Sequence, residues 1–285
     1  MTTSLHVEQQ ISRWLDEWNE KWRLDVEDFK RKALHQCAKA ERLEDVEQTL
    51  IKCALEQMDE ANPNLTHFAA WIYLQKLYRE AAENRGYARS ARYGSFYVLI
   101  CQLVKKGIYD ARLLDAYSKE EIEYFEQQIK PERDELFTYP AIYTLATRYL
   151  ATDYEKRTYE LPQERWMIIA MHLMQQEDKE KRTDYVLEAY WALSNLYMTV
   201  ATPTLNNAGK THGQLSSCFI DTVDDSLQSI YDSNADIAKL SKNGGGIGVY
   251  MGKVRARGSA IRGYKGMSSG VVPWIKQLNN TAVSV

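Results

Sequence analysis

Glycine is distributed very unevenly along this chain of 285 residues, and that distribution constrains the fold more than any other feature. Only three of the 14 glycines fall in residues 1–200, and the other 11 lie between Gly209 and Gly270. Because glycine weakens helix interiors and favours turns, the first part suits long helices and the second suits tight connections. We therefore predict a change of organisation near Thr202.

Charge follows the same division. Residues 1–200 carry 27 basic and 34 acidic side chains, whereas residues 201–285 carry nine and five. The net charge of −3 argues neither for nor against nucleic-acid binding, and we expect no nucleic-acid partner. No apolar run approaches the roughly 20 residues that span a bilayer, and the N-terminal sequence lacks the pattern of a signal peptide. We expect a cytoplasmic protein with no membrane partner.

The four cysteines, Cys37, Cys53, Cys101 and Cys218, lie far apart and show neither a CxxC nor a zinc spacing. That pattern suits reduced thiols. The first three occupy apolar positions of expected helices, so we predict that they are packing thiols. His172 also falls in an apolar helix face, where we expect a core or rim histidine and no ligand.

Apolar side chains recur at helical spacing through residues 1–200. One stripe predicts a tryptophan-rich helix face packed on a neighbour, and it consists of Ile11, Trp14, Leu15, Trp18 and Trp22. A break at the sequence NPN predicts a turn, with Thr66 as the following helix start. Ser118 and Glu121 have the spacing of a capping box.

The pattern changes after Val200. QLSSCFIDTV is rich in β-branched and aromatic residues between turn formers, which predicts a strand that contains Cys218. DDSLQSIYDSNADIAKLSKN predicts a helix of about five turns with aspartates at its start. IGVYMGKVRARG predicts a second strand. A strand, a helix and a strand together favour an α/β unit.

Three successive glycines, Gly244–Gly246, and then Gly248 lie where the helix should lead into the second strand. A glycine turn can present N–H groups to a phosphate. The string is neither a Walker loop nor a dinucleotide fingerprint, because Met251 stands where the last glycine of GxGxxG would fall. A tight helix-to-strand turn explains the glycines equally well, and both interpretations stay open.

Charged residues flank the same unit. Asp225 and Ser226 open the expected helix, and Arg255 and Arg262 follow the second strand. A carboxylate and two arginines can hold the ribose hydroxyl and the phosphates of a nucleotide, although each residue alone fits a helix cap or a solvated charge. The role of Cys218 also stays open, because a structural thiol is the default interpretation and no histidine stands out as a base for it.

Three blocks carry a specific resemblance: ATPTLNNAGK, LSSCFIDTVDDSLQSI and LSKNGGGIGVYMGKVRARGSAIRG. In order and spacing they resemble the large, catalytic subunit of class I ribonucleoside-diphosphate reductases, whose helical domain also resembles residues from about 45 to 200. The resemblance implies an all-helical domain followed by the first strands and helices of a ten-stranded α/β barrel. The expected domains are residues 1–44, 45–200 and 201–285.

The resemblance also assigns expected roles to residues. Cys218 matches one thiol of the redox pair that reduces the 2′ carbon of the substrate. Thr202, Ser217 and Gly246 match positions that bind the ribonucleotide. The specificity site, which takes a deoxynucleoside triphosphate or ATP with its magnesium, is matched by Asp225, Ser226, Leu227, Arg255 and Arg262. In the family that site lies at a homodimer interface formed partly by the helix corresponding to residues 225–243.

Further partners follow from the same resemblance. They are a radical-generating small subunit and an external dithiol of the thioredoxin or glutaredoxin type. Residues 1–44 show no glycine-containing basic stretch typical of an ATP cone. The radical cysteine, the second redox cysteine and the remaining barrel have no counterpart before Val285.

We therefore expect part of a reductase subunit, inactive alone, that is completed by a second polypeptide. The alternative is a catalytically inactive nucleotide-binding regulatory or interaction module. Retention of both Cys218 and Thr202 favours the first interpretation, because a pure effector sensor would need neither.

Overall fold

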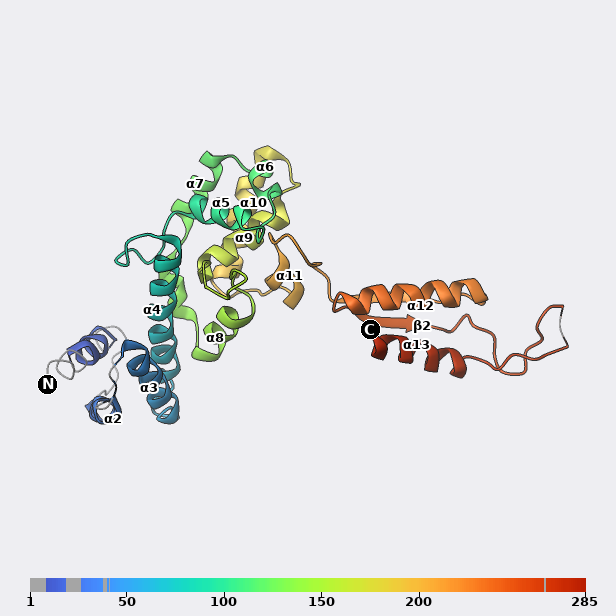
Figure 1. Ribbon diagram of the computed structural model, residues 1–285, viewed down its shortest axis with the longest axis horizontal. Helices are drawn as coiled ribbons and strands as arrows, with labels where there is room; N and C mark the ends of the chain where they lie inside the picture. Colours follow the sequence, from blue (N-terminus) through green and yellow to red (C-terminus); the bar gives the residue numbers. More distant parts are fainter. Residues whose placement is uncertain (1–8, 19–26, 38–39, 41, 264) are drawn as a thin grey trace. The chain divides into compact units, whose positions relative to one another are not determined.

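The computed structural model describes residues 9–18, 27–37, 40, 42–263 and 265–285. Residues 9–18 are helical, and the elements that follow are α2 (Glu27–Cys37), α3 (Leu43–Glu56), α4 (Leu65–Arg85), α5 (Phe96–Lys105), α6 (Arg112–Ala116), α7 (Lys119–Gln128), the 3₁₀ helix η1 (Pro131–Leu136), α8 (Tyr139–Arg148), α9 (Pro162–Met174) and α10 (Lys179–Ser194). Then come α11 (Thr202–Asn207), β1 (Cys218–Thr222), α12 (Leu227–Lys242), β2 (Gly246–Tyr250) and α13 (Val272–Ser284). Figure 1 shows the helical part in blue to yellow and the strand-containing part in orange to red.

The chain divides into two compact units by its own contacts. The first comprises Met1–Thr199 and Ala208–Thr211, and the second comprises Val200–Asn207 and His212–Val285. The division is therefore not a single cut, because the short segment 208–211 belongs to the first unit. The narrower domain limits expected from the sequence stay predictions.

The first unit is built around α4, which packs against α3, α8 and η1. The tryptophan-rich face is confirmed where it is described, because Ile11, Trp14, Leu15 and Trp18 are all buried. The Trp14 ring lies 6.2 Å from that of Trp71 on α4, and Trp18 lies 5.5 Å from Phe68. Trp22 lies outside the described residues.

Local signals in this unit have mixed outcomes. The capping box is confirmed, because Ser118 accepts from the Glu121 N–H and Glu121 accepts from the Ser118 N–H. The turn at NPN is present, but α4 begins at Leu65 and not at Thr66. The Thr66 hydroxyl instead accepts from the Tyr139 N–H at the start of α8, 3.2 Å away.

Cys37 and Cys53 are buried and Cys101 is half-buried, as expected for packing thiols. Burial, with a smaller effect of Cys53, raises the pKa of Cys37 to about 11. His172 is half-buried on α9, and burial followed by the neighbouring Arg112 lowers its pKa.

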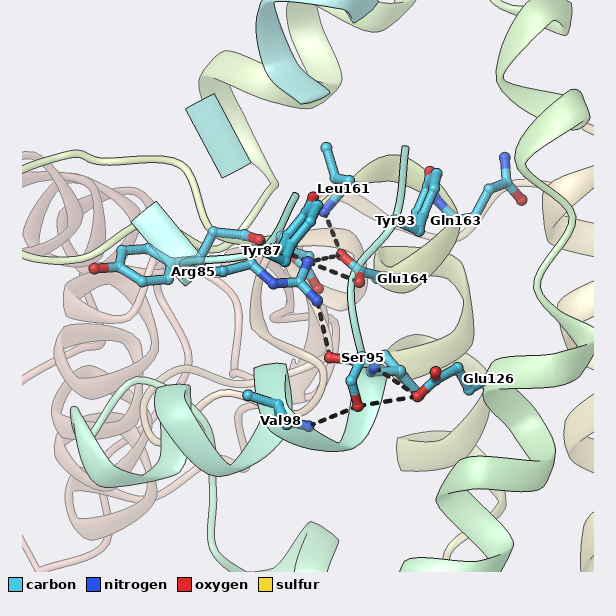
Figure 2. Close-up of polar contacts among 12 residues, drawn as sticks. Arg85, Tyr87, Tyr93, Ser95, Val98, Glu126, Leu161, Gln163 and Glu164 are labelled. Atoms are coloured by element: carbon cyan, nitrogen blue, oxygen red, sulfur yellow. Dashed lines mark hydrogen bonds and ion pairs between the residues drawn. The ribbon is translucent and has the colours of Figure 1, made fainter. Parts of the chain in front are cut away.

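A buried ion pair joins three elements of the first unit. Figure 2 shows Arg85, at the end of α4, donating to both carboxylate oxygens of Glu164 on α9, at 2.8 and 3.0 Å. The same guanidinium donates to the Ser95 carbonyl before α5, and Glu164 also accepts from the Leu161 N–H. Because each charge is paired and hydrogen-bonded, the pair can lie out of water.

A second buried carboxylate has only neutral donors. Asp134 on η1 is inaccessible to solvent and accepts from the Tyr78 hydroxyl at 2.6 Å, the Tyr93 hydroxyl at 2.7 Å and the Gln163 amide at 2.8 Å. Burial raises the pKa of Asp134 to about 6, and these three hydrogen bonds oppose the rise. The network ties η1 to α4 and α9.

The second unit contains a two-stranded parallel sheet, in which β1 pairs with β2 and α12 is the connection between them. α12 packs on β2 and on α13 (Figure 1). The expected strand–helix–strand order is confirmed, but the second strand ends at Tyr250 and not near Gly258. Its partner β1 ends at Thr222, and the Val223 N–H makes the last bond of the pair, to the Tyr250 carbonyl. In the described part of the chain no strand lies alongside the residues after Tyr250.

Among the described residues no helix is both long enough and apolar enough to cross a membrane.

We predict that Asp134→Ala destabilises the protein by about 3 kcal/mol or more, because three buried donors lose their acceptor. Chemical denaturation is the measurement, and the exposed Asp184→Ala on α10 is the control, for which a change within about 0.5 kcal/mol is expected. A loss below about 1 kcal/mol for Asp134→Ala would contradict the network.

A comparison of wild type with Asp134→Ala also gives a prediction about pH. The folded pKa of Asp134 is raised above the unfolded value, so the folded state binds the proton more tightly. That contribution to stability is present at acidic pH and is lost as the pH rises from about 4 to about 6. The stability difference between wild type and Asp134→Ala should therefore shrink over this range. A difference that grows would show that the folded carboxyl is stabilised in its ionised form.

Candidate functional site

The register of the two strands brings three of the predicted substrate-binding positions together. Cys218 is paired with Gly246 across the parallel sheet. The Gly246 N–H donates to the Ser217 carbonyl at 2.7 Å, and the Ser217 Oγ lies 3.6 Å from the Cys218 Sγ. Residues 28 positions apart in the sequence therefore form one small site.

The two faces of this sheet differ. Because side chains alternate along a strand, Cys218, Ile220 and Thr222 share one face with Gly246, Gly248 and Tyr250 of the neighbouring strand. All six are exposed, and Ile220 is 89% exposed. The opposite face carries Phe219, Asp221, Ile247 and Val249, which are half-buried. The Cys218 side chain thus lies on a bare face of a parallel sheet, which is unusual because parallel sheets are normally covered on both sides.

The glycines of the turn separate into two kinds. Gly244 has φ +76°, and a Cβ on Gly245 would lie 2.8 Å from the Phe219 ring, so conformation and packing explain this pair. A Cβ on Gly246 would have its nearest neighbour at 3.5 Å, and one on Gly248 at 3.9 Å. Neither glycine is required by packing. Both open toward the bare face, where they leave room for a ligand to approach the backbone.

Thr202 stands apart from this group. It is exposed at the start of α11. Other side chains connect α11 to the residues before β1. Thr204 donates to the Leu215 carbonyl and Asn207 donates to the Gln214 carbonyl, both at 2.9 Å. Neither residue was predicted from the sequence.

The expected effector residues lie at a separate pocket of the second unit. Asp225, Ser226, Leu227 and Arg255 line a pocket of about 380 Å³ together with apolar side chains that include Trp274. Trp274 was not predicted, and its ring lies 6.3 Å from that of Tyr231 on α12. Arg262 does not line this pocket and is exposed in the turn after Ile261.

An ion pair occupies one side of the pocket. The Arg255 Nε donates to both carboxylate oxygens of Asp225, at 3.0 and 2.8 Å, and the Arg255 backbone N–H donates to the same carboxylate at 3.1 Å. Arg255 also donates through Nη1 to the Ala260 carbonyl. The carboxylate that we expected to hold a ribose hydroxyl is engaged by the arginine that we expected to hold a phosphate.

Ser226 has a structural role at the same place. It is the N-cap of α12, and its hydroxyl accepts from the Ser229 N–H at 3.1 Å. The Ser229 hydroxyl in turn accepts from the Asp224 N–H at 2.9 Å. The cap therefore fixes the start of α12 and the position of Asp225 beside the pocket.

Comparison with protein families gives two matches that are consecutive along the chain. Residues 135–213 match the ribonucleotide reductase all-alpha domain, and residues 216–285 match the ribonucleotide reductase barrel domain. The chain belongs to the ribonucleotide reductase large-subunit family.

Relatives of this reductase family support the assignment. The chain is 45% identical over 191 residues to the ribonucleoside-diphosphate reductase subunit alpha of Treponema pallidum, which covers 67% of this chain and 22% of that subunit. It is 39% identical over 243 residues to the subunit alpha of Helicobacter pylori, covering 85% of this chain and 29% of the relative. For Synechocystis the identity is 33%, with 85% and 30% covered. The chain thus spans less than a third of the length of these relatives.

The reductase family match places Cys218, Ser217 and Gly246 within the segment similar to the barrel domain, and Thr202 within the segment similar to the helical domain. Their individual roles stay predictions. Among the described residues, no group of three or more His, Cys, Asp or Glu side chains is arranged to hold a metal ion.

The four thiols should differ in reactivity. We predict that Cys218 is alkylated by iodoacetamide at pH 8 at least about tenfold faster than Cys37 or Cys53, because it is exposed while they are buried with raised pKa values. Peptide mass spectrometry of partly alkylated protein measures the four rates. Equal alkylation rates for Cys218 and Cys37 would contradict the exposure of the Cys218 thiol on the bare face.

Proposed function

We propose that this chain provides the opening strands of the catalytic barrel of a class I ribonucleoside-diphosphate reductase, and that the remaining barrel completes the site. The observation that carries the proposal is the parallel strand pair whose bare face holds Cys218 opposite Gly246. In a closed barrel that face would point to the interior, where strands on the far side and a substrate would cover it. The match to the barrel domain over residues 216–285 supports the same conclusion.

In this proposal Cys218 is one of two thiols that reduce the ribonucleotide. The two thiols supply two electrons and two protons, the 2′ hydroxyl leaves as water, and the cysteines end as a disulfide. The second thiol belongs to the remaining barrel, and an external dithiol protein of the thioredoxin or glutaredoxin type then reduces the disulfide. A separate small subunit generates the radical that starts the reaction.

The groups around Cys218 suit substrate binding. The Ser217 hydroxyl lies beside the thiol, and Gly246 has no side chain to obstruct the approach of a ribonucleotide. Thr202 adds a hydroxyl from α11. Hydroxyl and backbone groups of this kind bind ribose and phosphate oxygens by hydrogen bonds.

The pocket at Asp225 is the proposed effector site. A deoxynucleoside triphosphate, or ATP, brings its own magnesium and several negative charges, which suit Arg255 and Arg262. Leu227 and Trp274 offer apolar surface for the base or the sugar. Binding would exchange part of the Arg255–Asp225 pair for contacts to the nucleotide, and a homodimer through α12 would add the partner's side of the site.

The reductase proposal is tested by co-expression of the chain with the remaining barrel and a small subunit, followed by assay of ribonucleoside diphosphate reduction. We predict multiple turnovers for wild type and none for Cys218→Ser, which has similar volume but forms no disulfide. Cys101→Ser is the control and should retain turnover. Repeated turnover by Cys218→Ser would exclude the redox role, and a stable chain with no affinity for the remaining barrel would favour the regulatory-module alternative.

Effector binding gives a separate prediction. Arg262→Ala and Arg255→Ala should each weaken dTTP binding by on the order of 1.5 to 3 kcal/mol, because each removes a charge-assisted phosphate contact. Arg257→Ala is the matched control, since Arg257 is an exposed arginine between the two on the same segment and is not one of the predicted effector residues. Calorimetry measures the three affinities. An unchanged affinity for Arg262→Ala would remove that residue from the site.

A further inference from the structure

We propose that Thr204 and Asn207 on α11 are positioning residues that hold Ser217 and Cys218 in register with Gly246. The inference rests on the proposed function, because it concerns the geometry of the same substrate site. Neither residue lies on the bare face of the sheet. They act through the backbone of residues 213–217, which leads into β1.

Two hydrogen bonds attach the residues before β1 to α11. The Thr204 Oγ1 donates to the Leu215 carbonyl and the Asn207 Nδ2 donates to the Gln214 carbonyl, both at 2.9 Å. Thr204 is only 8% exposed, and the Asn206 amide donates to the Asn207 Oδ1 at 3.0 Å, which orients the Asn207 amide. Two successive carbonyls, shortly before Ser217, are thus fixed to one turn of α11.

The backbone at Gly213 passes close to the Asn207 side chain. Gly213 has φ +103°, and a Cβ there would lie 2.3 Å from the Asn207 Cγ. The backbone can therefore pass close to the amide only because residue 213 is glycine. This close approach places the Gln214 carbonyl within reach of Asn207.

A further hydrogen bond connects the residues before β1 to the glycine turn. The Gln214 Nε2 donates to the Asn243 carbonyl at 3.3 Å, directly before Gly244. After the turn, the Gly246 N–H donates to the Ser217 carbonyl at 2.7 Å. The hydrogen bonds therefore link α11, the residues before β1 and the start of β2. These are the three places that carry Thr202, the Ser217–Cys218 pair and Gly246.

The test uses a matched pair of variants. Thr204→Val keeps the shape and removes the hydroxyl, whereas Thr204→Ser keeps the hydroxyl and loses a methyl group. Native-state hydrogen exchange in the full chain reports on the Gly246 N–H. The Val223 N–H, which bonds to the Tyr250 carbonyl at the other end of the strand pair, is the control amide.

We expect Thr204→Val to speed exchange at Gly246 by roughly fivefold, the effect of losing one buried hydrogen bond, and Thr204→Ser to restore the wild-type rate. Exchange at Val223 should stay unchanged in both variants. Equal acceleration at Gly246 and Val223 would indicate general loosening and would overturn the proposal, as would no change at Gly246. Asn207→Asp, which keeps the size but loses the amide donor, should act like Thr204→Val.

The completed reductase supplies the functional arm. Thr204→Val should raise the KM for the ribonucleotide by roughly fivefold, with dTTP affinity unchanged and with rescue by Thr204→Ser. An unchanged KM, or an equal loss of dTTP affinity, would overturn the positioning role. If wild type shows no reductase activity at all, the proposed function fails, and the exchange measurement still decides whether these side chains hold the register.

Discussion

The parallel pairing of β1 with β2 is the constraint on which the geometry around Cys218 depends. Parallel strands require a crossover, which α12 supplies, and the crossover covers one face of the pair. The register then places Cys218 beside Gly246 on the other face. Two strands with one bare face bury little apolar surface, and the small core of the second unit centres on Val223, Ile230 and Val254. The register therefore defines the positions around Cys218, while one face of the strand pair is exposed.

The first unit has an extensive core of its own. It buries a tryptophan-rich core around α4 and two carboxylates, Glu164 and Asp134, that are each satisfied by several donors. The same unit holds the segment 208–211, because the Ala208 carbonyl accepts from the buried Arg165 and the Lys210 ammonium donates to the Tyr149 carbonyl at 3.1 Å. The second of these bonds lies eight residues before Cys218. A helical unit followed by a glycine-rich unit with strands is what the glycine distribution leads us to expect.

Periodicity and short motifs predicted much of the architecture. The helix face at Trp14 and Trp18, the capping box at Ser118 and the strand–helix–strand order all depend on local patterns, and all three are present. The predicted end of β2 was wrong. The end of a strand depends on where its partner strand ends, and the residues after Tyr250 do not indicate where β1 ends.

Contacts between distant side chains and backbone could not be predicted. The Asp225–Arg255 pair, the Asp134 network and the bonds from Thr204 and Asn207 to carbonyls join residues whose separation has no fixed period. The claim that the bare face of the strand pair is the inside of a barrel is tested most directly by the alkylation rate of Cys218. The rate is measured with and without a polypeptide that carries the remaining barrel. We predict strong protection of Cys218 on assembly, with the rates of Cys37 and Cys53 unchanged. An unchanged Cys218 rate in a formed complex would show that the bare face is not the inside of a barrel and would contradict the account.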